Sequence, residues 1–267
     1  MKKLVILAVV LRLLVSAFYF HPDIKTYNFQ SSFLGKGVFN IYSYLIDNKK
    51  TLPLKEEYIY FPLTYFTVGG YQLLASGLLG HNFSAWLSDA VANTVVRDPN
   101  IFKYLIILKL PYLLIDIAVA YLLLEIFEND KEKGKKAFIL WLFNPFTIVL
   151  FYIFGNIDII PVALTLVSYY LSRKNKLVLS SLFLGIASGF KLYPILFLPF
   201  LALLGRDAKE RLKIVGVCLG TLLIVVLPFI SPAFIQSAVI SGLTTRIFNP
   251  GFSIGFNENN IGGLTGA

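Results

Sequence analysis

The sequence predicts an all-α membrane protein with about seven transmembrane helices, and three observations support this. Apolar residues occupy 57% of the 267 positions and charged residues only 15%, a balance far from that of a soluble globular domain. The apolar residues form long runs, as membrane-spanning helices require. The formal net charge is +9, but lysine and arginine gather in short clusters between those runs. That distribution is typical of cytoplasmic loops and excludes a nucleic-acid-binding surface.

The basic clusters fix the expected orientation. The first apolar run follows Lys2 and Lys3, and no small-residue cleavage site follows it. We therefore interpret it as a span with a cytoplasmic N-terminus rather than as a signal peptide. We place the later clusters KEKGKK, RKNK and RDAKERLK on the same cytoplasmic side. The seven expected spans are 4–20, 104–127, 138–154, 157–171, 177–190, 192–204 and 212–230.

This arrangement divides the chain into a membrane module, residues 1–230, and an outer C-terminal segment, residues 231–267. Residues 21–103 form a large outer loop within the module. The segment 63–79 is apolar enough to span the membrane, but one more crossing would invert every later loop. Either it lies along the outer interface or it pairs with the run 84–96. We favour the first, because the run 84–96 is interrupted by polar residues.

Two ionisable residues, Asp158 and Lys191, stand at breaks between apolar runs on the outer side. Charges at membrane depth are expensive and by default mark functional sites. The runs that flank Lys191 hold about 14 and 13 residues, or ~20 Å each at 1.5 Å per residue, whereas the hydrocarbon core is ~30 Å thick. We therefore expect Lys191 at the floor of an outward-facing depression, where its ammonium group would suit a phosphate or another anion.

Other polar residues have both an ordinary and a functional interpretation. Asp158, in the turn GNID with Asn156, either complements a helix dipole or binds a ligand such as sugar hydroxyls. Asp23 is either a solvated acid at the interface or a carboxylate that accepts a proton from a hydroxyl nucleophile. Asp116 lies mid-span and either is functional or is neutralised by a structural partner such as Lys109.

Three further residues complete the candidate binding set. Tyr60 belongs to the motif YIYFPL, which is also typical of an aromatic belt followed by a helix-starting proline. Tyr193 follows Lys191 in the same outer turn, and Arg246 stands in the outer C-terminal segment. The single cysteine excludes a cysteine-based metal site, and a histidine site has little support, because the two histidines stand sixty positions apart.

Four motifs, in order, resemble those of a known superfamily. The runs LWLFNPFTIVLFYIFGNIDIIPVALTLVSYYL and FLGIASGFKLYPILFLPF are similar to the membrane core of the GT-C glycosyltransferases, which use polyprenyl-phosphate-sugar donors. Within them, the chain resembles the catalytic subunit of glycosylphosphatidylinositol (GPI) mannosyltransferase I and prokaryotic polyprenol-linked mannosyltransferases. The segments YIYFPLTYF and LKLPYLLIDIAVAYLL resemble a tyrosine- and proline-containing loop motif and the span that follows it.

The resemblance implies a seven-span module whose long first outer loop bears the catalytic acid. Asp23 would then be the general base for a hydroxyl of a lipid or glycan acceptor, which attacks the sugar's anomeric carbon with inversion. Asp158 would organise the pocket, and Lys191 would neutralise the phosphate of a polyprenyl-phosphate-sugar donor, such as dolichyl phosphate mannose. The expected location is a prokaryotic cell membrane, with the active site on its outer face.

The chain departs from the family pattern in two respects. Mannosyltransferase I enzymes carry Asp-x-Asp in the first outer loop, whereas Lys25 stands here in place of the second acid. This departure disfavours a divalent metal but leaves it open, and the sequence establishes no cofactor. The chain also stops at Ala267, although these enzymes continue with further spans. We therefore expect either a fragment of a longer protein or a minimal form. An accessory subunit is neither implied nor excluded.

Two other classes of function compete with the enzyme. A transporter or lipid flippase would use Asp116, Asp158 and Lys191 along a translocation path. Transporters often contain repeated halves with broken helices, and the sequence has no such internal repeat. A non-catalytic lipid-binding or assembly subunit is the third class.

Overall fold

The computed structural model describes residues 1–241, and every regular element in that range is helical. This confirms the predicted all-α class. The first helix, α1, is Lys2–Phe18. The helices of the expected outer loop are α2 (Pro22–Ser31), η1 (Ser32–Lys36), α3 (Ile41–Asp47), α4 (Pro62–Leu74), α5 (Ser76–Leu79), α6 (Phe83–Ser88) and α7 (Ala92–Arg97). The apolar helices that follow are α8 (Ile101–Ile126), α9 (Lys131–Leu142), α10 (Pro145–Ile148), η2 (Val149–Ile153), α11 (Ile159–Arg173), α12 (Leu177–Ser188), η3 (Tyr193–Phe197), α13 (Leu198–Leu203), α14 (Ala208–Val226), η4 (Leu227–Phe229), α15 (Pro232–Phe234) and η5 (Ile235–Ser241).

Three stretches are long and apolar enough to cross a membrane by themselves: Ile101–Ile126, Lys131–Ile153 and Ala208–Phe229. A fourth candidate is α1 together with α2 and η1, two parts that meet at an angle of 82°. Three of the other expected spans are shorter apolar helices: Ile159–Arg173, Leu177–Ser188 and Tyr193–Leu203. The seven expected runs therefore all appear as apolar helical elements, with boundaries shifted by a few residues.

Local sequence explains where the helices of the outer loop begin. Pro22 and Pro62 stand in the first turns of α2 and α4, where a proline's missing N–H costs nothing. The His21 side chain caps α2 by accepting a hydrogen bond from the Asp23 N–H. The segment 63–79 forms α4 and α5, of 13 and 4 residues. Neither helix is among the candidate spans, which agrees with its expected place in the loop.

The third expected span contains an irregularity that the apolar pattern does not reveal. After α9 the helix restarts at Pro145, with the Asn144 side chain accepting a hydrogen bond from the Phe146 N–H. It then continues as a five-residue π-helix, Val149–Ile153, before ending at the Gly155 turn. π-Helical turns are rare and often occur at functional sites. This one directly precedes the turn that carries Asp158.

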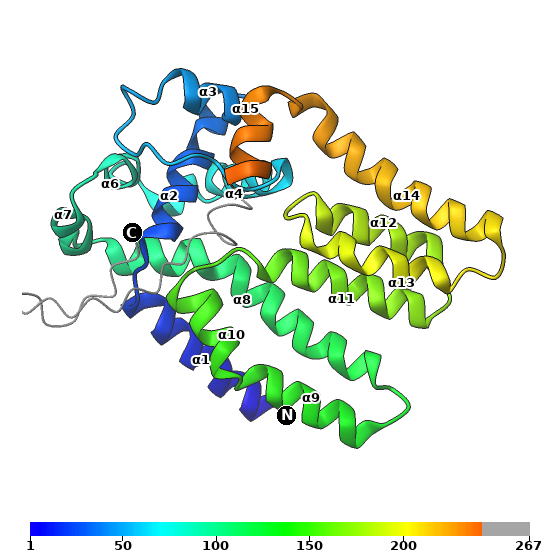
Figure 1. The fold of residues 1–267 in the computed structure, drawn as a ribbon. Coiled ribbons are helices and arrows are strands. Elements are labelled where there is room, and N and C mark those ends of the chain that lie inside the picture. The colour runs from blue at the N-terminus through cyan, green and yellow to red at the C-terminus, as the bar shows by residue number, and fades with distance from the viewer. Residues whose placement is uncertain (242–267) are drawn as a thin grey trace, which may run out of the picture.

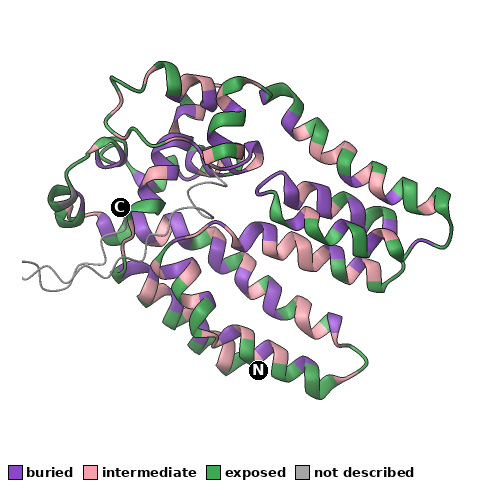
Figure 2. Ribbon diagram, in the orientation of Figure 1, coloured by how far each residue is buried: buried purple, intermediate pink, exposed green. Residues whose placement is uncertain are grey.

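The helices form a molecule with two distinct ends (Figure 1). The outer-loop helices gather at one end, together with α15. The N-terminus and the turns α8–α9, α11–α12 and α13–α14 lie at the opposite end. The largest buried cluster joins the outer-loop helices to the neighbouring ends of the spans. By contrast, α14 has only three buried residues, and Figure 2 shows the rest of it as exposed or intermediate, as expected of an apolar helix that faces lipid.

Candidate functional site

The structure brings Asp158 and Lys191 into direct contact. Asp158 stands at the N-cap of α11, and Lys191 follows the end of α12. Because α11 and α12 pack against each other in opposite directions, the outer end of one lies beside the outer end of the other. The two side chains form an ion pair and are only 19% and 10% exposed, respectively. The two outer turns predicted from the apolar pattern are therefore neighbours in space.

Asn156 shapes the turn that presents Asp158. Its side-chain oxygen accepts a hydrogen bond of 3.0 Å from the Asp158 N–H, which fixes the start of α11. The preceding Gly155 has φ of 66°, in the left-handed region that favours glycine. A Cβ on Gly155 would also stand 3.0 Å from the side chain of Ile24 in α2. The turn thus packs tightly against the outer loop.

Tyr60 lies over the Lys191 ammonium, with 5.3 Å between the Nζ atom and the ring centroid. This is the geometry of a cation–π contact. Backbone hydrogen bonds hold the segment in place: the Phe61 N–H donates to the carbonyl of Phe190 and the Leu63 N–H donates to that of Gly189. The loop motif YIYFPL and the Lys191 turn are thus one structural unit, although about 130 residues of sequence separate them.

Two tyrosines that the sequence analysis did not select connect this unit to α2. The Tyr27 hydroxyl donates to the Gly155 carbonyl at 2.7 Å and shares a hydrogen bond of 2.5 Å with the Tyr112 hydroxyl. The Tyr27 ring also packs edge-on against Tyr60. Tyr27 follows Asp23 by four residues, so the two lie on the same face of α2. That spacing was the available signal.

Asp23 lies in the first turn of α2, and its side chain is 67% exposed. One carboxylate oxygen is 3.5 Å from His21 Nδ1, and the His21 ring packs against Phe154, with 4.9 Å between the centroids. Ile24, the next residue, contacts Gly155. Asp23 is therefore near the turn that bears Asp158, with its side chain open to solvent.

Two residues of the predicted set remain, Tyr193 and Arg246. Tyr193 begins the 3₁₀-helix after Lys191, is 36% exposed and interacts electrostatically with Asp158. It therefore belongs to the same group. Arg246 lies outside the described residues.

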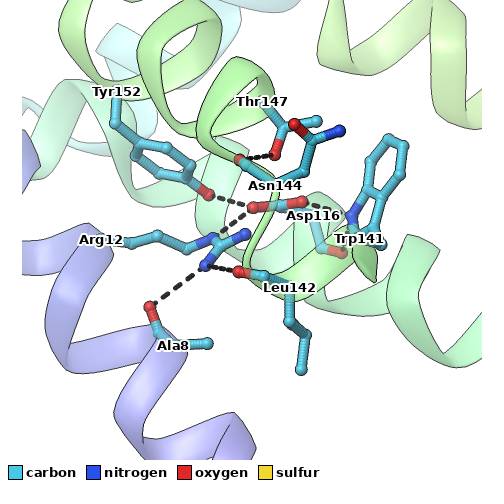
Figure 3. Close-up of polar contacts among 8 residues, drawn as sticks. All are labelled: Ala8, Arg12, Asp116, Trp141, Leu142, Asn144, Thr147 and Tyr152. Atoms are coloured by element: carbon cyan, nitrogen blue, oxygen red, sulfur yellow. Dashed lines mark hydrogen bonds and ion pairs between the residues drawn. The ribbon is translucent and has the colours of Figure 1, made fainter. Parts of the chain in front are cut away.

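Asp116 is fully buried and lies in a polar network, which corrects one expectation (Figure 3). Its partner is Arg12 of α1 and not Lys109: the Arg12 Nε atom lies 2.5 Å from the carboxylate. Tyr152 donates its hydroxyl proton to the same carboxylate at 2.8 Å, and Trp141 donates its indole N–H at 2.6 Å. Arg12 also donates to the Leu142 carbonyl. A carboxylate held this completely ties three spans together and is a poor candidate for a translocation path.

Lys109, which is buried on α8 two turns before Asp116, makes a different set of contacts. Its ammonium group donates to three backbone carbonyls, those of Ser16, Tyr19 and Tyr152. Two of these belong to the C-terminal end of α1, where carbonyls lack helical partners. The third belongs to the π-helix. Lys109 thus satisfies backbone groups that would otherwise be unpaired at membrane depth.

The described residues contain no group of three or more histidine, cysteine or acidic side chains that could hold a metal ion. Lys25, which replaces the second acid of the Asp-x-Asp pattern, is buried and turned away from Asp23. Its ammonium group donates to the Asp89 carbonyl and lies over the Trp86 ring at 5.9 Å. Burial lowers the pKa of Lys25, against the opposing effect of the Asp89 and Glu56 charges. Lys25 therefore anchors α2 to the α6–α7 segment.

A family model described as glycosyltransferase family 87 matches residues 105–251, more than half of the chain and including both Asp158 and Lys191. Among curated proteins, the chain is 32% identical over 95 residues to GPI mannosyltransferase 1 of Candida albicans and 35% identical over 104 residues to that of Dictyostelium discoideum. It is 25% identical over 156 residues to that of Kluyveromyces lactis.

The matched regions cover 34%, 37% and 54% of this chain, in the same order of relatives. They cover 24%, 23% and 39% of the relatives, so the chain spans well under half the length of these proteins. No solved structure matches the chain. The extent of the family match, over the spans that carry the ion pair, decides the classification: the chain belongs to glycosyltransferase family 87.

Proposed function

We propose that this protein is a membrane mannosyltransferase that moves a sugar from a polyprenyl-phosphate-linked donor to a hydroxyl group of a lipid or glycan acceptor. The observation that carries the proposal is the group formed by Lys191, Asp158 and Tyr60, with Asp23 nearby. A recessed cation and an accessible carboxylate on the neighbouring α2 suit transfer from a sugar phosphate: one group for the leaving phosphate and one for the acceptor's proton.

In the proposed reaction the acceptor oxygen attacks the anomeric carbon of the sugar as the bond from that carbon to the phosphate oxygen breaks. Asp23 takes the proton of the acceptor hydroxyl. The bonding electrons leave with the polyprenyl phosphate, and Lys191 stabilises the charge that develops there. Attack from the face opposite the phosphate inverts the anomeric centre. No step requires a metal ion.

Asp158 and Tyr60 have supporting roles in this scheme. Asp158 holds the Lys191 ammonium in place, and a charge held in advance costs little reorganisation during the reaction. Tyr60 covers the same ammonium with its ring, which limits the access of water. Asn156 shapes the Asp158 turn, and Tyr193 adds a half-exposed phenol at the edge of the group.

The proposed location rests on the arrangement of the helices. The start of α2, which carries Asp23, the start of α11 at Asp158 and the end of α12 before Lys191 point toward the end of the molecule that carries the outer-loop helices, away from the basic turns. By the positive-inside rule we assign those basic turns to the cytoplasm, which supports an outer location for the proposed site. A prokaryotic cell membrane stays a prediction.

The test is sugar transfer by the purified full chain, with labelled polyprenyl-phosphate mannose and an extract of native lipids and glycans. Asp23→Asn should lower kcat/KM by about 10²–10⁴-fold, the usual contribution of a general base. Asp47→Asn is the matched control, because Asp47 is an exposed acid of the same loop. Near-normal transfer by Asp23→Asn would remove Asp23 from the mechanism.

Lys191 is tested in the same assay. Lys191→Ala should lower kcat by about 10²–10³-fold, because the leaving phosphate loses a fixed cation, and Lys191→Arg should recover part of the loss. Lys50→Ala, at an exposed lysine of the outer loop, is the control. Uptake of the labelled lipid into proteoliposomes without any transfer would favour a transporter over the enzyme.

A further inference from the structure

A cavity of about 360 Å³ lies between α11, α12 and the η3–α13 segment. Its walls include Phe197, Phe200 and Leu204 on one side and Thr165 and Tyr169 on another. The cavity is separate from the ion pair, but the same three segments form both. Asp158 starts α11, and Lys191 joins α12 to η3.

The hydroxyl groups in the cavity wall are already used. Thr165 donates to the Pro161 carbonyl of its own helix at 2.7 Å, and Ser172 donates to the Tyr169 carbonyl at 2.7 Å. Ser168 and Ser180 bond to each other, with 2.9 Å between their oxygens, and to each other's carbonyls. The wall therefore offers a ligand mainly hydrocarbon and aromatic surface, which binds apolar chains and not sugars or ions.

The cavity lies directly below Lys191 along the chain. Phe197 follows Lys191 by six residues, which is about 12 Å at the 2.0 Å rise of a 3₁₀-helix. Leu204 lies another seven residues on, about 10 Å further at 1.5 Å per residue. A ligand with an anionic head at Lys191 would therefore reach the cavity with the part of its hydrocarbon tail that lies about 12–22 Å from the phosphate, which a long chain has and a short one lacks.

We propose that this cavity binds the isoprenoid chain of a polyprenyl phosphate whose phosphate group lies at Lys191. The inference rests on the proposed function and deepens it by assigning the donor's tail to a place in the fold. A single-chain lipid fits better than a diacyl phospholipid, because one cavity of this size between three helices holds one chain. Lys191 would bind the phosphate and the apolar cavity would bind the chain, so the two together favour a ligand that has both parts.

The experiment measures binding and not turnover. The purified full chain in phosphatidylcholine nanodiscs is titrated with undecaprenyl phosphate and with geranyl phosphate, which share a head group and differ in chain length. Thr165→Phe should fill the cavity and lower the long-to-short affinity ratio about tenfold, the loss expected for about two buried methylene groups. Its binding of geranyl phosphate should stay normal, which also reports that the variant is folded.

Val167→Phe is the matched control. Val167 is a half-buried, β-branched residue of nearly the same shape as Thr165, two positions along α11 and outside the cavity wall. It should keep the wild-type ratio. Lys191→Ala should weaken both ligands equally, because they share the phosphate group.

An unchanged affinity ratio in Thr165→Phe would overturn the inference. Equal competition by dioleoyl phosphatidic acid would overturn it too, since the cavity would then take acyl chains without preference. Failure of the proposed function can be told apart from failure of the cavity assignment. If the protein shows the expected affinity ratios but no sugar transfer, the enzyme proposal is wrong and the cavity assignment stands. Sugar transfer that ignores chain length in every variant removes the cavity assignment and leaves the enzyme.

Discussion

Arg12 and Asp116 carry opposite charges that meet in the interior of the molecule, and both side chains are fully buried. Burying two charges is costly, and their attraction offsets the cost only when further hydrogen bonds complete the site. Asp116 has those additional bonds, from Tyr152 and Trp141. The structure therefore predicts that the cost of burying each charge is offset only while the other charge is present.

Removing one partner should therefore be worse than removing both. Arg12→Leu or Asp116→Leu alone leaves a buried group unpaired and should lower the free energy of unfolding by about 3–5 kcal/mol. The double variant Arg12→Leu, Asp116→Leu should recover a large part of this loss. Thermal unfolding of the purified protein in detergent measures all three. A double variant as unstable as the sum of the singles would show that the two charges act independently.

The pair also shows what the sequence could not tell. A charge in each of two apolar runs indicates that both need partners, but 104 positions separate Arg12 from Asp116, and Lys109 is much closer in sequence. Only the packing of α1 against α8 decides between them. Asp158 and Lys191 were predictable as neighbours because they stand at the same ends of two spans that follow each other in the chain. The antiparallel order of those spans alone brings them together.

At the scale of elements, α12 packs closely against α14 because of Gly185. A Cβ at this position would lie 2.6 Å from the Cys218 carbonyl oxygen and 2.7 Å from the Thr221 Cβ atom. Small residues that let helix backbones approach closely are a general device of helix packing in membranes. The contact holds α12, and with it the Lys191 turn, at a fixed distance from α14.

Gly185→Ala should force the two helices apart and destabilise the protein by about 1–3 kcal/mol, the usual cost of overpacking. Gly220→Ala is the control, because a Cβ at Gly220, on α14 itself, meets no atom within 4 Å. Chemical unfolding followed by fluorescence compares the two. Equal stability of Gly185→Ala and Gly220→Ala would mean that the close approach is not required.

Most of the apolar helices were predictable from the sequence to within a few residues, because long apolar runs bounded by basic clusters specify that helices exist there. The π-helix at Val149–Ile153 and the 3₁₀-helix at Tyr193–Phe197 were not. Both consist of apolar and aromatic residues that fit a regular α-helix equally well. Tyr27 and Tyr112 were missed for a similar reason, since a tyrosine in an apolar segment has many ordinary roles.

At the scale of the whole molecule, the basic turns and the outer-loop helices lie at opposite ends. Single-cysteine labelling tests whether those ends face opposite sides of a membrane. In a background with the buried Cys218 changed to alanine, Lys133→Cys, Lys174→Cys and Lys209→Cys should react with a membrane-impermeant maleimide on one side of sealed vesicles. Lys50→Cys should react on the other. Labelling of Lys50→Cys together with the other three would overturn the proposed orientation.

The π-helix connects the buried Arg12–Asp116 network to the Asp158–Lys191 ion pair. The number of residues in this segment therefore affects how the two are oriented relative to each other. Each residue of a regular α-helix turns the chain by about 100°, and a π-helical turn accommodates one residue more than an α-helical turn does. Tyr152, inside this segment, is bonded to Asp116, whereas Asp158, just beyond it, is paired with Lys191. The angular phase between the structural network and the outer site is thus set by a single extra residue. A one-residue deletion here would leave the segment just as apolar and yet rotate Asp158 away from its partner.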